Sequence, residues 1–72
     1  MLVCPRCDGQ GSVVRAQVVK TNKTIFICDE CDATWFTLEA IESEAWVDYG
    51  THMEEQGLSP TWDELKILGD AA

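Results

Sequence analysis

The chain has 72 residues, enough for one small domain whose apolar core needs an additional source of stability. Its formal net charge is −8, and a surface of this sign repels phosphates, so we expect no direct binding to nucleic acid. The sequence contains no apolar run of the roughly 20 residues that cross a bilayer. It also shows neither a secretion signal nor a lipidation signal. We therefore expect a soluble, cytoplasmic protein without a membrane partner.

Four cysteines form two pairs, CPRC at residues 4–7 and CDEC at residues 28–31, separated by 20 residues. Two residues between paired cysteines let one turn aim both thiolates at a single point, and two such turns supply the tetrahedral sulfur set that Zn²⁺ accepts. Gly9 suits the positive φ that such a turn often needs, whereas the second pair has Asp32 and Ala33 in its place. The spacing predicts one structural zinc ion, on which folding of at least the N-terminal half depends. Its predicted ligands are Cys4, Cys7, Cys28 and Cys31.

Three other interpretations of the cysteines remain open. A CPxC pair is typical of dithiol redox sites, but these need a strand and a helix N-terminus around the pair, and only three residues precede Cys4. Iron in a rubredoxin-like site uses the same four ligands, although the aromatic packing around both pairs that is typical of such a site is missing. A disulfide scaffold suits a secreted chain, yet residues 1–20 have no signal-peptide pattern. Zinc and reduced thiols are the favoured interpretation.

The first half of the chain has the pattern of a β-hairpin with an added strand. Residues 12–19 are rich in β-branched side chains, residues 24–27 form a second short strand, and residues 20–23 form the turn, where Asn22 tolerates a left-handed backbone. Residues 33–36 can add a third strand, with Trp35 covering the metal site and the hairpin. The sequence predicts a zinc ribbon over residues 1–36.

The second half has a helical pattern. Thr37 is a good N-cap, and a stripe of apolar side chains at spacings of three and four predicts a helix over residues 38–56, with Gly57 as its left-handed end. A second helix is predicted to open at Ser59-Pro60, or to be capped by Thr61 with Glu64, and to end near Leu68. The stripe comprises Leu38, Ile41, Ala45, Tyr49 and Met53.

The predicted fold class is therefore a small metal-stabilised α+β domain. A zinc ribbon of two to three short antiparallel strands, residues 1–36, is followed by two α-helices. These helices form an acidic extension, residues 37–72, which packs on the ribbon so that the chain is one domain.

The charge is concentrated in the second half. Residues 1–36 hold four acids and four bases, whereas Lys66 is the one base after residue 36 and faces nine acids. This acidity is either a solvated helix face or a docking surface for a basic protein partner. The nine acids are Glu39, Glu42, Glu44, Asp48, Glu54, Glu55, Asp63, Glu64 and Asp70.

The candidate partner contacts follow from this charge. Glu42, Glu44 and Asp48 would attract the partner, and Trp46 or Trp62 would anchor it, although the simplest role of a tryptophan is in the core. His52 is expected to be an exposed helix residue. The sequence contains no nucleophile paired with a base and no glycine loop that cradles phosphate, so we expect no enzyme activity.

Two resemblances add expectations. The run CDECDATWFTLE at residues 28–39, with CPRC upstream, resembles small bacterial zinc ribbons of the transcription-factor-IIB-like type over about residues 2–42. It departs from them where Asp32 and Ala33 replace the usual glycine pair. This resemblance implies the four cysteines as ligands. Zinc ribbons are shared by many functions, and a role as an adaptor or regulator in transcription or translation machinery is the alternative function.

The whole molecule, being small, acidic and without catalytic residues, resembles the immunity proteins of bacterial toxin systems, including contact-dependent growth inhibition. This second resemblance implies an inhibitor that covers the basic active site of a nuclease toxin. A gene just upstream that encodes a large secreted toxin with a basic C-terminal domain would favour this role over the adaptor role.

Overall fold

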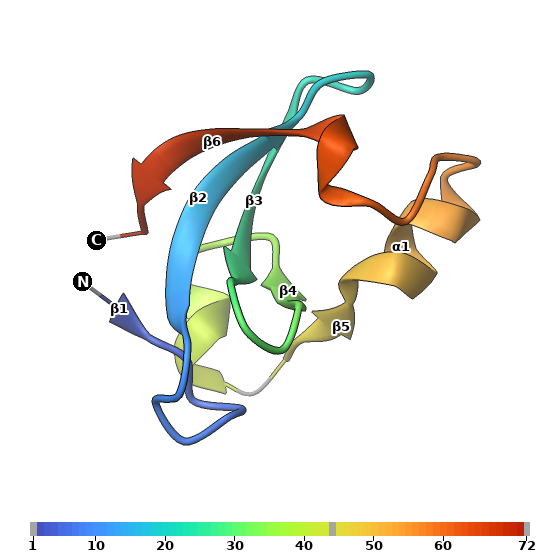
Figure 1. The fold of residues 1–72 in the computed structure, drawn as a ribbon. Helices are drawn as coiled ribbons and strands as arrows, with labels where there is room; N and C mark the ends of the chain where they lie inside the picture. The colour runs from blue at the N-terminus through green and yellow to red at the C-terminus, as the bar shows by residue number, and fades with distance from the viewer. Residues whose placement is uncertain (1, 44, 72) are drawn as a thin grey trace.

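The computed structural model describes residues 2–43 and 45–71, so Glu44, one of the predicted contact residues, lies outside the described residues. The described chain is an antiparallel sheet of six strands with one short α-helix (Figure 1). Its elements in order are β1 (Leu2–Val3), β2 (Ser12–Val18), β3 (Lys23–Cys28), β4 (Ala33–Trp35), the 3₁₀ helix η1 (Glu39–Ser43), β5 (Val47–Asp48), α1 (Tyr49–Glu55), the 3₁₀ helix η2 (Trp62–Glu64) and β6 (Leu65–Asp70).

Strand β2 is the centre of the sheet. On one edge it pairs with β3, which is followed by β4 and then β5. On the other edge two strands lie end to end: β1 pairs with Ser12 and Val13, and β6 pairs with residues 14–18. The last strand of the described chain therefore returns to the hairpin, and the end of β6 lies near β1 (Figure 1), since Leu2 pairs with Val13 and the Ala71 N–H donates to the Val13 carbonyl.

The predicted hairpin and third strand are confirmed. β2 and β3 pair in continuous register from Val13↔Cys28 to Val18↔Lys23, and β4 adds to β3. Asn22 in the connecting turn has φ +58°, and its N–H donates to the Val18 carbonyl at 2.8 Å. An asparagine tolerates this left-handed conformation, as the sequence indicated.

Two apolar cores lie on opposite faces of the β2–β3 hairpin, because alternate residues of a strand point to opposite faces. We call them the metal-side core and the helix-side core. The metal-side core consists of Cys4, Val13, Cys28, Ala33, Trp35, Ile41 and Ala71. The helix-side core consists of Ala16, Val18, Ile25, Ile27, Tyr49 and Met53, with Leu58, Trp62 and Leu65 packed against it.

The predicted helix over residues 38–56 is wrong. Thr37 does cap a helix, since its Oγ1 accepts the Ala40 N–H at 3.1 Å, but that helix is the short η1. The chain then pairs with β4 through Val47 and Asp48, and Asp48 caps α1 by accepting the Thr51 N–H at 3.0 Å. Of the apolar stripe, Ile41 lies in the metal-side core, Tyr49 and Met53 lie in the helix-side core, and Leu38 and Ala45 are exposed. One straight helix cannot reach both faces of a sheet.

The predicted second helix is also wrong, and with it the two-helix extension. η2 covers only Trp62–Glu64, the Thr61 side chain makes no capping hydrogen bond, and the chain continues as β6. Leu65 and Ile67 pair with Val18 and Ala16, so β6 covers an edge of β2 that would otherwise be open. A helix of two turns is marginal in water, and completing the sheet outweighs it.

The end of the predicted first helix is correct. α1 ends at Glu55, and Gly57 has φ +73°. The Gly57 N–H donates to the Glu54 carbonyl at 3.0 Å, and the Leu58 N–H donates to the Met53 carbonyl at 2.9 Å. These two hydrogen bonds form a Schellman motif, in which Leu58 closes over the last turn.

Tyr49, the one tyrosine of the chain, gives a test of the helix-side core. It is fully buried, and its O–H donates to the Thr61 carbonyl at 2.7 Å. Burial, followed by the charges of Glu64 and Asp32, raises the pKa of Tyr49 to about 12. A group whose pKa is raised on folding stabilises the fold below its unfolded pKa, about 10, and this stability is lost as the pH rises through about 12.

We therefore expect tyrosinate absorbance of the folded protein to appear near pH 12 and that of the urea-unfolded chain near pH 10. In Tyr49→Phe, the part of the alkaline loss of stability that comes from the phenol should disappear. A folded-state titration midpoint near the unfolded value would show that Tyr49 is not buried in this way.

Candidate metal centre

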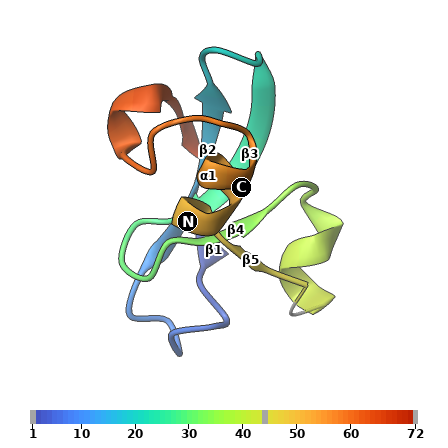
Figure 2. The ribbon, with the colours of Figure 1, turned by 90° about the vertical axis from the view of Figure 1, so that its right-hand side faces the viewer.

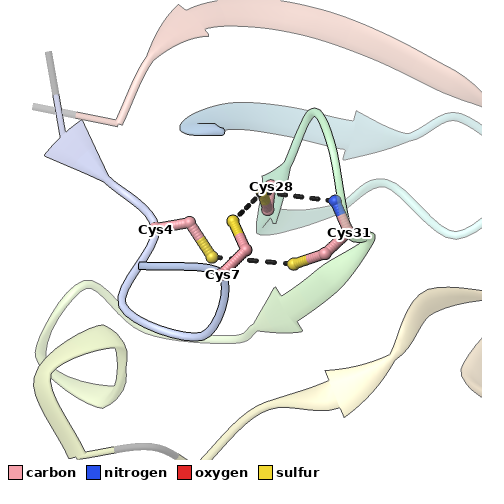
Figure 3. A group of neighbouring side chains, drawn as sticks. All are labelled: Cys4, Cys7, Cys28 and Cys31. Atoms are coloured by element: carbon pink, nitrogen blue, oxygen red, sulfur yellow. Dashed lines mark hydrogen bonds between the residues drawn. The ribbon is translucent and has the colours of Figure 1, made fainter. Parts of the chain in front are cut away.

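The four cysteines come from two loops that the hairpin places opposite each other. Cys4 and Cys7 lie in the loop after β1, Cys28 ends β3, and Cys31 lies in the turn before β4 (Figure 3). Their four sulfur atoms lie within 4.8 Å of one another, with Cys4–Cys31 and Cys7–Cys28 distances of 3.7 Å. The predicted ligands are thus brought together, and all four are free thiols.

This arrangement fits a tetrahedral ion. With a metal–sulfur distance of about 2.3 Å, the edges of a tetrahedron of thiolates are about 3.8 Å long, close to the 3.7 Å of the two measured pairs. Cys4 and Cys28 are fully buried, so the site is continuous with the metal-side core. The four cysteines are positioned to bind a metal ion. A bound ion would supply stability that a larger apolar core would otherwise have to provide on this face of the sheet.

Both cysteine turns use left-handed residues. In the first, Asp8 and Gly9 have φ +56° and +78°, as the glycine indicated. In the second, Asp32 takes φ +61°, so the turn forms without the usual glycine. The Glu30 and Cys31 N–H groups donate to the Cys28 sulfur at 3.4 and 3.5 Å, which stabilises a thiolate there.

Gly11 is a site residue that the sequence analysis missed. A methyl group at this position would lie 2.5 Å from the Cys28 sulfur and 2.8 Å from the Glu30 Cβ. Its carbonyl accepts the Cys4 N–H at 3.0 Å, so it also holds the first loop. Glycine is needed here because the backbone passes directly beside the sulfur of a distant cysteine. No local pattern in the sequence signals that approach.

The thiols differ in how readily they ionise. Burial raises the pKa of Cys28 to about 12 and also raises the pKa of Cys4. At Cys31 the effect of burial is outweighed by hydrogen bonds from the Ala33 amide and the Arg6 guanidinium, and the pKa falls to about 7. A bound cation stabilises thiolates, so metal binding releases protons and strengthens as the pH rises.

Any assignment of a metal or a function to this chain depends on the geometry of the site. No family model, curated protein or solved structure matches this chain. The sulfur cluster is compatible with a zinc ribbon, so that resemblance rests on the two cysteine motifs and their geometry. No helix within residues 2–43 and 45–71 is long and apolar enough to cross a membrane.

Trp46, one of the two predicted anchor tryptophans, makes an internal contact. The Arg6 guanidinium carbon lies 4.2 Å from the centre of the Trp46 ring, and Arg6 Nη1 donates to the Cys31 carbonyl at 3.2 Å. This cation–π contact joins the first cysteine loop to the segment that leads into β5.

Trp62 and Asp48 also have structural roles. Trp62 packs on the helix-side core, and its Nε1 donates to Asp32 Oδ1 at 3.3 Å. Asp48 is exposed, but its carboxylate caps α1, and the hydrogen bonds from Thr51 lower its pKa. Of the predicted contact residues within the described ranges, Glu42 is the exposed acid for which the structure gives no internal role.

Proposed function

We propose that this chain is a zinc-stabilised protein without catalytic activity that binds a basic protein partner through its acidic C-terminal half. In its most specific form, the proposal is that the chain is an immunity protein that neutralises a nuclease-type bacterial toxin. The acidic surface consists of strands, 3₁₀ turns and a short helix, in place of the two helices expected from the sequence. Zinc is assigned because a closed set of four thiolates is typical of structural zinc, and elemental analysis would distinguish it from iron.

The observation that supports the partner is the exposure of uncompensated carboxylates. Within residues 2–43 and 45–71 the one ion pair joins Lys20 to Glu64 at 3.1 Å. Six acids after residue 36 other than the helix cap are exposed, and such a surface attracts a basic protein and speeds its association. These acids are Glu39, Glu42, Glu54, Glu55, Asp63 and Asp70.

The partner is to be captured from the source cells with the metal-loaded protein and identified. The proposal expects a basic protein whose binding weakens as salt is added; inhibition of a nuclease activity of that partner supports the immunity role. A component of the transcription or translation machinery would support the adaptor role instead. Capture of nucleic acid or of an acidic protein would contradict the proposal.

Charge reversal tests the surface once the partner is identified. Glu42→Lys is expected to slow association several-fold and to reduce its salt dependence, with a smaller effect on dissociation. The double variant Thr21→Lys, Thr24→Lys makes the same change in net charge on the exposed hairpin. Equal slowing in both variants would mean that only the total charge matters and that the C-terminal half is not the contact surface.

A further inference from the structure

A groove of about 510 Å³ lies at the end of the molecule that carries α1. It is bordered by the start of β3, the residue after β4, the short β5 and one face of α1. Its lining includes Phe36, Val47 and His52, with Lys23, Asp48 and Glu55 at its polar positions. Figure 1 shows α1 on the side of the sheet away from the two chain ends, and Figure 2 views the molecule from that side.

The groove exists because the sheet narrows. β4 ends at Trp35, which pairs with Phe26, so residues 23–25 of β3 extend beyond it. β5 has only two residues and does not fill the space. Phe36 and Val47 are consequently left 44% and 37% exposed. The His52 ring lies 5.0 Å from the Phe36 ring and forms part of the wall.

This groove offers apolar surface that internal packing does not use. Trp46 is 38% exposed but has the Arg6 guanidinium over its ring, and Trp62 donates to Asp32 and packs on the helix-side core. Phe36 and Val47 are also partly exposed, and both line the groove. The volume is within the range of about 300 to 1,000 Å³ in which proteins bind small ligands and side chains.

The charge around the groove indicates what can occupy it. Asp48 and Glu55 outnumber Lys23 in the lining, and the hydrogen bonds that lower the pKa of Asp48 keep its carboxylate ionised. The chain as a whole carries a net charge of −8. A cationic segment is therefore attracted to the rim, whereas an acidic segment is repelled.

We propose that the groove receives a large apolar side chain from a partner segment in which lysine or arginine flanks that side chain. This inference rests on the proposed function, because it gives the basic partner a specific point of attachment. The apolar side chain covers Phe36 and Val47, and the flanking cations lie against Asp48 and Glu55.

The test uses a synthetic peptide, Lys-Lys-Leu-Phe-Lys-Lys, added to the metal-loaded, ¹⁵N-labelled protein. We expect chemical-shift changes concentrated on Phe36, Val47 and His52. Replacing Leu-Phe in the peptide by Ser-Ser, or its lysines by glutamates, is expected to weaken binding about tenfold or more. Phe36→Ser is expected to weaken it similarly. Leu38→Ser is the matched control, because Leu38 is 45% exposed outside the groove, and it should bind as the unaltered protein does.

The outcomes separate this inference from the proposed function. If the shifts are spread over the acidic residues outside the groove, and the Ser-Ser peptide binds with equal affinity, the groove is not the binding site. This result would not contradict a basic partner. If the glutamate peptide binds as tightly as the lysine peptide, the proposal that the segment in the groove is cationic is wrong. Binding in the groove, together with capture of a partner that is not basic, would retain the groove and overturn the proposed function.

Discussion

Cys28→Ser is expected to remove the metal and unfold the metal-side core. Binding of structural zinc to small domains contributes about 10 to 16 kcal/mol, compared with a net stability of about 5 to 15 kcal/mol for a typical domain. Cys28 is fully buried, and its sulfur accepts the N–H groups of Glu30 and Cys31, so a serine hydroxyl would lose both the metal and the fit to these donors. Metal content and the dispersion of the amide NMR spectrum measure the result.

Glu30→Ala is the matched control, because Glu30 is exposed in the same turn. The alanine keeps the backbone N–H that donates to the Cys28 sulfur. It should bind one metal ion and remain folded. A Cys28→Ser protein that keeps a dispersed spectrum in the presence of a chelator would show that the fold does not depend on the metal. Bound iron with visible absorbance would overturn the assignment of zinc.

Gly11→Ala is expected to weaken metal binding although it changes no ligand. The added methyl group would lie 2.5 Å from the Cys28 sulfur and 2.9 Å from Asp29 Oδ1, closer than carbon approaches either atom. The sulfur must move out of its tetrahedral position, and losing the support of a metal ligand typically costs about 10- to 100-fold in affinity. Overpacking adds about 1 to 3 kcal/mol of destabilisation. Competition with a chromophoric chelator measures the affinity.

Gly50→Ala is the control for adding a methyl group. Gly50 lies in α1, and a methyl group there would be 3.4 Å from Asp48 Oδ2 and 3.6 Å from the Pro60 Cβ, which is ordinary contact. An alanine in a helix is favoured over glycine by up to about 1 kcal/mol, so metal affinity should be unchanged and stability unchanged or higher. Unchanged metal affinity in Gly11→Ala would show that the first loop can move away from Cys28.

The cluster of four cysteines and the hairpin were predictable because their signals are local. The spacing within each cysteine pair defines a turn, and the β-branched run with its Asn22 turn defines the hairpin that joins the two pairs. Gly57 and Leu58 form the predicted helix end for the same reason, since a Schellman motif depends on a few adjacent residues.

The second half of the chain was not predictable because its structure depends on distant pairing. The spacing of Ile41, Tyr49 and Met53 indicates that they are buried but not on which side of the sheet. Val47 becomes a strand residue only because Thr34 of β4 is available to pair with it. The run around Ile67 suits a helix or a strand, and the open edge of β2 selects the strand.

Because β6 pairs with β2, the second edge of β2 is covered only after the last strand of the described chain has been made. The ribosome releases both cysteine pairs well before β6, so the metal can be bound while Val14–Val18 still has no partner on that edge. An unpaired strand edge is a template for aggregation. Early metal binding would hold the hairpin in register through that interval, so metal starvation should reduce the yield of newly made protein more than it harms molecules that are already complete.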